Sequence, residues 1–272
     1  MSVTITEFTD PFCTWCWGAE PLLRRLEEVY GKQLHVEFVM GGLIADFDSF
    51  HDPANGITEP SDVAPHWEEA AARHGMPVDA DVWHENPPQS SYPASIAFEA
   101  AEFQERDLAN QYLRRLREAF ATERRKIDER DVLLELAADV GLDTDKLETD
   151  IESDRAKAAF EEDRAYTRDL GVQTFPTFRI SGNDTKQWLA GSQSFETVVS
   201  ELEAVDPGLE QTAPRPLSEF IEQYTPVATR EVAEVYELED ETAEKRLQEL
   251  ATDGVIERSR RGTGSLWKSV AN

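Results

Sequence analysis

The chain has 272 residues, of which 40% are hydrophobic, and it carries 55 acidic residues against 27 Lys and Arg, for a formal net charge of −28. This length and apolar content suffice for one large or two ordinary domains and argue against a disordered chain. The acidic residues are spread along the sequence, as in a halophilic protein kept soluble in concentrated salt, and would repel nucleic acid over most of the surface.

The amino terminus predicts a strand rather than a secretory signal. Residues 3–8 alternate apolar and polar side chains, and they lack both a basic start and a long apolar stretch. No run in the sequence approaches the roughly 18 apolar residues of a membrane span. We therefore expect a cytoplasmic protein that has no membrane partner.

The first strand leads into a motif with both cysteines of the chain. Asp10 and a proline end the strand, and C-T-W-C-W-G follows at residues 13–18. Apolar residues then recur at helical spacing until Gly31, and residues 34–40 alternate as a second strand. A crossover of this length makes the two strands parallel. The cysteines therefore stand at the start of a crossover helix.

The middle of the chain predicts helices, with a return to strands near residue 171. Helical patterns fill an insertion at about 57–168, including one long amphipathic stretch at 94–121. Strand patterns follow at 171–180 and 187–190, and residues 195–205 form a short amphipathic helix that could close the same sheet. We assign residues 1–206 to this first domain.

A proline- and glycine-containing segment at 207–215 is the best linker in the chain, because it suits neither a helix nor a central strand. Beyond it, residues 216–224, 229–236 and 240–252 predict three helices. A glycine-tipped hairpin follows from residue 254. We expect a small second domain at 216–272.

The two cysteines form the strongest candidate site. At a helix start, positions i and i+3 share one face, with α-carbons about 5 to 6 Å apart, which an unstrained disulfide accepts. Cys13 faces the helix N-terminus and is expected to be the exposed nucleophile, and Cys16, one turn deeper, is expected to be the resolving thiol. Asp10 is a nearby acid that would partly oppose thiolate formation.

A second candidate element is Phe175-Pro176, a proline inside a strand-like run. A cis peptide bond would explain this position, and the corner would expose the Phe175 backbone to an extended substrate beside the cysteines. We also expect Thr14, Trp15 and Trp17 to contact substrate, although Trp17 suits the core equally well.

Other chemistry at the cysteines is less well supported. A zinc site needs four ligands, and the five histidines make no tight pair at ligand spacing, so no metal or cofactor is predicted. An inert, buried thiol pair fits poorly with a helix start.

The motif residues at 8–18 resemble the opening F-x-D-P-x-C-x-W-C-x-W-G of thioredoxin-like dithiol proteins of the DsbA type, especially the cytoplasmic FrnE-like branch. The resemblance covers about residues 1–205 and includes G-V-x-x-x-P-T-F at 171–178. It implies an α/β thioredoxin-like fold with a helical insertion, in which Cys13 is the nucleophile, Cys16 the resolving thiol and Pro176 the facing cis-proline. In that family a small or β-branched residue commonly precedes this proline, whereas here it is Phe175.

The C-terminal residues resemble a winged helix, a fold that often binds DNA through its third helix and its wing. The predicted wing holds a basic patch, namely Arg258, Arg260, Arg261 and Lys268. The third helix is mostly acidic, so nucleic acid is not the favoured partner. We favour a domain that dimerises the chain or presents substrates to the dithiol.

Together these features predict a cytoplasmic thiol-disulfide oxidoreductase that acts on disulfides of proteins or small thiols, with an unidentified redox partner. The alternatives are a redox-sensing adaptor, which hands a partner to a protease, and a DNA-binding regulator. A glutathione-dependent isomerase of the related kappa type is disfavoured, since such enzymes use a single serine or cysteine.

Overall fold

The computed structural model describes residues 2–50, 52–53, 55–182 and 184–270. Its larger sheet has the strand order β2-β1-β3-β4. Strands β1 (Val3–Thr9) and β2 (Leu34–Met40) are parallel, while β3 (Thr177–Gly182) and β4 (Thr185–Ala190) continue the sheet in antiparallel fashion. Two segments far apart in the sequence therefore build one mixed sheet, as the sequence predicts.

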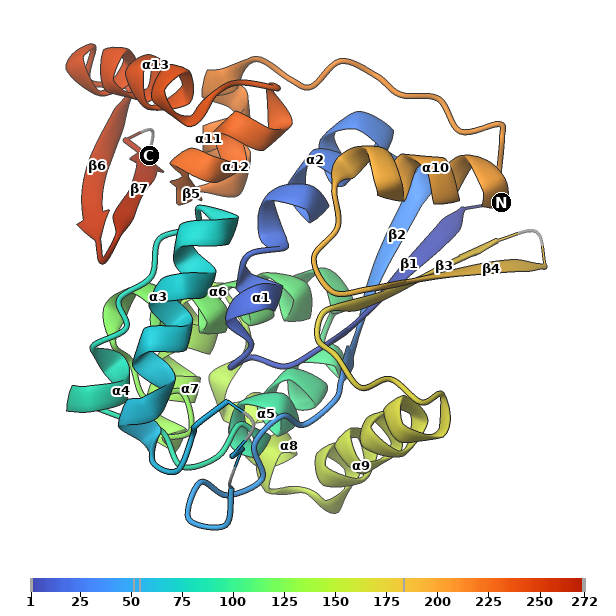
Figure 1. Cartoon of the computed structure of the whole chain (residues 1–272), viewed down its shortest axis with the longest axis vertical. Helices are drawn as coiled ribbons and strands as arrows, with labels where there is room; N and C mark the ends of the chain where they lie inside the picture. The colour runs from blue at the N-terminus through green and yellow to red at the C-terminus, as the bar shows by residue number, and fades with distance from the viewer. Residues whose placement is uncertain (1, 51, 54, 183, 271–272) are drawn as a thin grey trace.

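One face of this sheet is covered by α2 (Glu20–Tyr30) and α10 (Phe195–Val205) (Figure 1). Their leucine and valine side chains pack on Val3, Ile5 and Ile180, which alternate along the strands toward that face. The opposite face receives α9 (Asp154–Asp169), whose Tyr166 ring lies against Phe8. The central strands β1 and β3 are thus covered on both faces, whereas Trp188 of the edge strand β4 is 43% exposed.

The insertion between β2 and β3 is helical, as predicted. It contains η2 (Pro60–Asp62), α3 (Val63–His74), α4 (Val82–Glu85), α5 (Tyr92–Glu102), α6 (Arg106–Glu123), α7 (Arg130–Asp139), α8 (Thr144–Glu152) and α9. The prediction of one continuous stretch over 94–121 is wrong, because the chain leaves the helix after α5. There the Gln104 side chain bonds both backbone groups of Asp143, at 2.9 and 3.0 Å, and this long-range pairing overrides the local helical pattern.

The strand predicted over 171–180 is also shorter than expected, since β3 begins only at Thr177. Pro176 has no N–H with which to extend a ladder, so residues 171–176 approach the sheet as a loop. This loop carries Phe175 to the end of the central strands where the cysteines lie, because β3 begins opposite the end of β1.

A C-terminal unit contains α11 (Leu217–Tyr224), β5 (Val227–Ala228), α12 (Thr229–Val235), α13 (Asp240–Thr252), β6 (Ile256–Arg261) and β7 (Gly264–Ser269). Its antiparallel sheet has the order β5-β7-β6, and the unit has its own core around Trp267 and Phe220. In Figure 1 this unit lies beside α2 and α3. The preceding segment at 207–215 follows α2, where the Thr212 N–H donates to the Val29 carbonyl at 2.8 Å.

Among the described residues, every helix is too short or too polar to span a lipid bilayer.

Candidate active site

The cysteines occupy a single helical turn, α1 (Thr14–Trp17). Cys13 is the N-cap residue of this turn, and its Sγ accepts the N–H of Cys16 at 3.2 Å. Pro21 at the start of α2 has no N–H to offer the preceding turn, so the chain breaks at Gly18 and Ala19. The α1 group that faces the Cys13 sulfur is therefore this local N–H at the start of a single turn, rather than the N-terminus of a long helix.

Both cysteines are free thiols, and both are buried. Cys13 is 6% exposed and Cys16 is 0% exposed, so the prediction of an exposed nucleophile is wrong. The Cys13 sulfur is covered by the loop that carries Phe175. Burial, and after it the hydrogen bond with Cys13, raises the pKa of Cys16 well above that of an ordinary thiol. Cys16 thus remains a thiol at neutral pH.

The Phe175-Pro176 peptide bond is cis, which confirms that part of the sequence prediction. The Cys13 Sγ donates to the Phe175 carbonyl oxygen at 3.5 Å, so the proline loop and the cysteines are brought together. The Phe175 ring lies on Gly41, where an added Cβ would come within 1.9 Å of the ring. A glycine after β2 is therefore what admits the aromatic residue at this position.

Of the three residues predicted to contact substrate near the cysteines, only Trp15 is partly exposed. Thr14 is 7% exposed and Trp17 is 1% exposed, so burial favours the core alternative for Trp17, and contact of Thr14 with substrate stays a prediction. The Trp17 indole donates to the Pro77 carbonyl at 2.9 Å, and the guanidinium of Arg114 lies 4.2 Å from the centre of its ring. Trp17 thus belongs to the core between α1 and the insertion.

The sequence interpretation missed His74, the last residue of α3. Its Nε2 lies 3.4 Å from the Thr14 hydroxyl, and its ring meets that of Trp15 edge to face at 5.9 Å. The sequence gives no local signal of this contact, because His74 lies 60 residues from Thr14.

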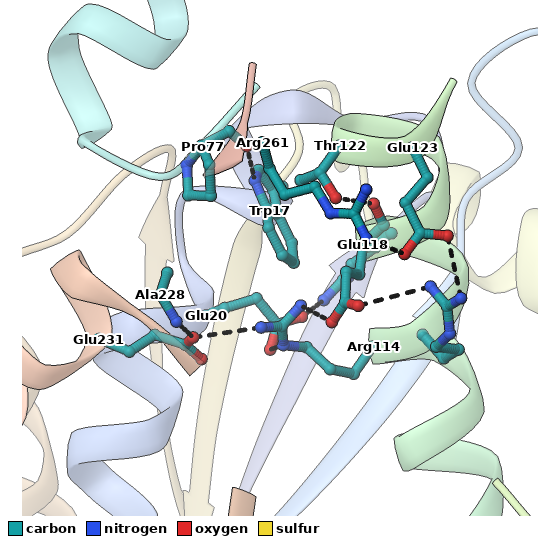
Figure 2. Close-up of polar contacts among 12 residues, drawn as sticks. Trp17, Glu20, Pro77, Arg114, Glu118, Thr122, Glu123, Ala228, Glu231 and Arg261 are labelled. Atoms are coloured by element: carbon teal, nitrogen blue, oxygen red, sulfur yellow. Dashed lines mark hydrogen bonds and ion pairs between the residues drawn. The ribbon is translucent and has the colours of Figure 1, made fainter. Parts of the chain in front are cut away.

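A buried group of ion pairs lies near Cys16, whose thiol interacts electrostatically with Glu7 and Arg117, and Figure 2 shows the Glu20, Arg114 and Glu231 side chains of this group. Arg117 of α6 is 1% exposed and contacts Glu7 of β1 at 3.0 Å and Glu20 of α2 at 2.6 Å. Burial raises the pKa of Glu7, whereas the guanidinium groups around Glu20 outweigh its burial and hold its pKa below the usual range. Arg114 extends the group to Glu231 of the C-terminal unit at 3.1 Å. These ion pairs therefore connect α6 both with the thioredoxin-like part of the chain, through Glu7 and Glu20, and with the C-terminal unit, through Glu231.

Asp10 is fully buried next to the cysteine motif, and its hydrogen bonds hold the segment that leads into the motif. Its carboxyl group accepts hydrogen bonds from the N–H groups of Phe12 and Leu43, at 2.8 and 2.6 Å, and from the Ser91 hydroxyl at 2.7 Å. Burial nevertheless raises its pKa to about 6. Asp10 thus joins the cysteine loop to the insertion, a role that sequence reasoning did not anticipate.

The basic patch is divided between engaged and exposed side chains. Arg258 contacts Glu244 of α13, and Arg261 lies 3.7 Å from Glu123 of α6. Arg260 and Lys268 are exposed. The turn between β6 and β7 faces residues 77–79, so the predicted wing is packed against the insertion rather than standing free.

Comparison with known proteins places the chain in a family. The family model described as Thioredoxin matches residues 7–200. The ClpXP adapter protein SpxH of Halalkalibacterium halodurans is 31% identical over 270 residues, which are 97% of this chain and 88% of the relative. SpxH of Bacillus subtilis is also 31% identical, over 272 residues and with the same coverage.

A solved structure gives a second point of comparison. The cytosolic disulfide reductase DsbM of Pseudomonas aeruginosa matches with a TM-score of 0.57 at 28% identity, over 74% of this chain and 94% of DsbM. These likenesses confirm a thioredoxin-like α/β fold with a helical insertion. The chain belongs to the thioredoxin family, in the group that includes the SpxH adapters.

Proposed function

We propose that the chain is a redox-responsive adaptor that binds a protein partner, with Cys13 and Cys16 as the responsive pair. The observation that carries this proposal is the extent of the likeness. SpxH relatives match 97% of this chain, including the C-terminal unit, whereas DsbM matches 74% of it and is itself almost fully covered. The portion of this chain that the match to the reductase DsbM leaves uncovered is thus covered by the match to the SpxH adapters.

We assign residues 216–272 to a winged-helix-like domain and residues 207–215 to its linker. The element order α11, β5, α12, α13, β6, β7 supports this assignment. Its third helix presents acidic side chains, and the turn of its wing packs on the insertion, so a protein partner is favoured over nucleic acid. By likeness to the relatives, the partner would be a protease component of the ClpXP kind, in the cytoplasm.

The dithiol responds by thiol–disulfide exchange. The Cys13 thiolate attacks a disulfide sulfur, that disulfide breaks, and its other sulfur leaves as a thiol after taking a proton. Cys16 then loses its proton and attacks the Cys13 sulfur, which frees the second thiol. Two electrons pass from the pair to the substrate, and an intramolecular disulfide remains. Because burial holds Cys16 in the thiol form, we expect this second step to be the slower one.

Disulfide reduction as the main activity is the second candidate. It is supported by the contact between Cys13 Sγ and the Phe175 carbonyl, since an extended substrate could pair with the loop beside it. The likeness to DsbM also favours it. The complete pair of cysteines continues to disfavour a glutathione-dependent isomerase.

Two assays on the purified full-length chain distinguish these functions. An adaptor should bind a ClpX-type unfoldase from the same organism saturably in interferometry, with an affinity that differs about 5-fold or more between the reduced and oxidised chain. It should accelerate insulin reduction by glutathione less than about 10-fold, which is far below the rates expected of an enzyme. Rapid insulin reduction that Cys13→Ser abolishes, together with no unfoldase binding, would replace the adaptor by a reductase.

A further inference from the structure

One short segment separates the dithiol helix from the C-terminal unit. Residues 74–79, here called the bridging segment, run from the last residue of α3 toward α4. On the dithiol side, the His74 ring occupies the face of α1 formed by Thr14 and Gly18. A Cβ added at Gly18 would lie 2.6 Å from His74 Cγ, so the imidazole rests directly on the backbone that follows the cysteines. The ring therefore limits where this turn can move.

The hydrogen bonds of His74 define its tautomer. Its Nδ1 accepts the N–H of Met76 at 3.1 Å, so the ring proton is on Nε2. Nε2 therefore donates to the Thr14 hydroxyl, at a long 3.4 Å. Burial lowers the pKa of His74 to about 4, and the imidazole is neutral at physiological pH. The residue thus acts through its shape and one directed N–H rather than through charge.

The C-terminal unit holds the other side of the bridging segment. The Thr263 N–H donates to the Val78 carbonyl at 2.9 Å, and the Val78 N–H donates to the Thr263 hydroxyl at 3.0 Å. Between β6 and β7, a Cβ added at Gly262 would lie 2.0 Å from the Val78 carbonyl oxygen. Only a residue without a side chain permits this backbone approach.

The two sides meet within a few residues. The Pro77 carbonyl, next to Val78, accepts the indole N–H of Trp17, which directly follows Cys16 (Figure 2). Arg230 of α12 covers Gly75, where an added Cβ would lie 3.0 Å from its Cδ. A shift of the bridging segment would therefore change its contacts with the dithiol turn, which are made by His74 and Trp17. It would also change its contacts with the C-terminal unit, which are made by Thr263 and Arg230.

We propose that His74 is a positioning residue of the Cys13–Cys16 pair, and that the C-terminal unit sets its position by holding the bridging segment. This inference deepens the proposed redox function and rests on it. The contacts described above belong to the protein with free thiols, in which the parts fit at contact distance. In this proposal these contacts on both sides of the bridging segment, here called the clamp, fit the dithiol form better than the disulfide form, so loosening the clamp favours the disulfide, since coupling between two sites is reciprocal.

The first test changes His74 in two matched ways. In His74→Gln the amide N–H can replace Nε2 as the donor to Thr14, whereas in His74→Asn the shorter amide replaces Nδ1 and cannot reach Thr14. The full chain is equilibrated with a glutathione redox buffer, and the ratio of reduced to oxidised dithiol is measured by alkylation and mass spectrometry. His74→Asn should lower this ratio about 5-fold or more, and His74→Gln should restore it to within about 2-fold of the wild type.

The second test acts from the other side of the segment. Gly262→Ala places a methyl group against Val78, whereas Gly254→Ala is its matched control, because Gly254 also has a positive φ but nothing within 4 Å of an added Cβ. Gly262→Ala should lower the ratio of reduced to oxidised dithiol as His74→Asn does. Gly254→Ala should leave it unchanged.

Equal ratios in the wild type, His74→Asn and Gly262→Ala would overturn this inference, as would an equal shift in Gly254→Ala. Its failure is distinct from failure of the proposed redox function. In the latter case the wild-type cysteines would not cycle between dithiol and disulfide in the glutathione buffer at all.

Discussion

The dithiol turn and the turn between β6 and β7 lie on opposite sides of the bridging segment and are positioned by different means. The first is set largely by local geometry, with a cap from Cys13 and a helix break before Pro21. The second is set by backbone contact with Val78, a residue 185 positions away from Thr263. The position of the cysteines thus follows from neighbouring residues, whereas the proposed control of their redox state depends on packing between distant segments.

The largest effect is expected from breaking the ion pairs on the dithiol side. Arg117→Met leaves Glu7 and Glu20 buried without their main partner, and it should lower the free energy of unfolding by about 3 to 5 kcal/mol. Urea unfolding measures this loss. Arg168→Met is the matched control, because that side chain is 74% exposed, and it should cost less than about 0.5 kcal/mol. A loss below 1 kcal/mol in Arg117→Met would show that the buried group is not held as described.

A smaller loss is expected where the same ion pairs enter the C-terminal unit. The Glu231 carboxylate accepts the Ala228 N–H at 2.6 Å and contacts Arg114 at 3.1 Å. Glu231→Gln keeps an acceptor for the backbone but removes the charge, so it should cost about 1 to 3 kcal/mol in urea unfolding. The exposed Glu241→Gln in α13 is the control. Equal stability of the two variants would contradict a buried link between the C-terminal unit and α6.

At the end of β2, Glu99 and Asp163 form a pair of carboxyl groups instead of an ion pair. This difference predicts that the stability of the chain depends on pH. Burial raises the pKa of Glu99 to about 9, next to Asp163, whose carboxylate accepts the Met40 N–H at 2.7 Å. The folded chain keeps the Glu99 proton that the unfolded chain loses near pH 4.5, so stability should fall as pH rises from 4.5 to 9.

Replacing Glu99 tests whether this residue causes the pH dependence of stability. Glu99→Gln retains a donor to Asp163 without a titrating proton, and it should flatten the fall between pH 5 and 8 by about 1 to 3 kcal/mol. Thermal or urea unfolding at several pH values tests it. A wild-type and a variant curve of the same slope would mean that Glu99 is ionised in the folded chain.

The smallest effect is expected in the basic patch of the C-terminal unit. Arg260→Ala should change the free energy of unfolding by less than about 0.5 kcal/mol, whereas Arg261→Ala removes the contact with Glu123 and should cost about 1 kcal/mol. Neither variant should alter electrophoretic retardation of DNA, which we expect to be absent in high potassium chloride. Specific, redox-dependent retardation that is lost in both variants would favour the DNA-binding alternative.

Much of this fold follows from local patterns in the sequence. The strand, helix and strand at the start, the cis bond at Pro176 and the three C-terminal helices are signalled by periodicity or by a proline in an unusual place. The roles of Cys13, Cys16 and Pro176 in catalysis or sensing stay predictions.

The remaining features depend on distant partners that leave no periodic mark. Trp17 is buried because Pro77 and Arg114 surround it, and His74 reaches the dithiol only after α3 folds over α1. Likewise, the sequence around Gly262 is that of an ordinary hairpin turn, and only the structure shows that the Val78 backbone leaves no room for a side chain there. A single sequence gives the residue types at these positions but not the residues that lie next to them in space.

The coupling across the bridging segment is tested most directly by amide hydrogen exchange of Thr263, whose N–H donates to Val78. The rate is measured by NMR in the full chain, once with free thiols and once with the Cys13–Cys16 disulfide. We expect exchange about 5-fold or more faster in the disulfide form, because the clamp fits the dithiol form and opens more often when that fit is lost. Rates equal within about 2-fold in the two forms would contradict it.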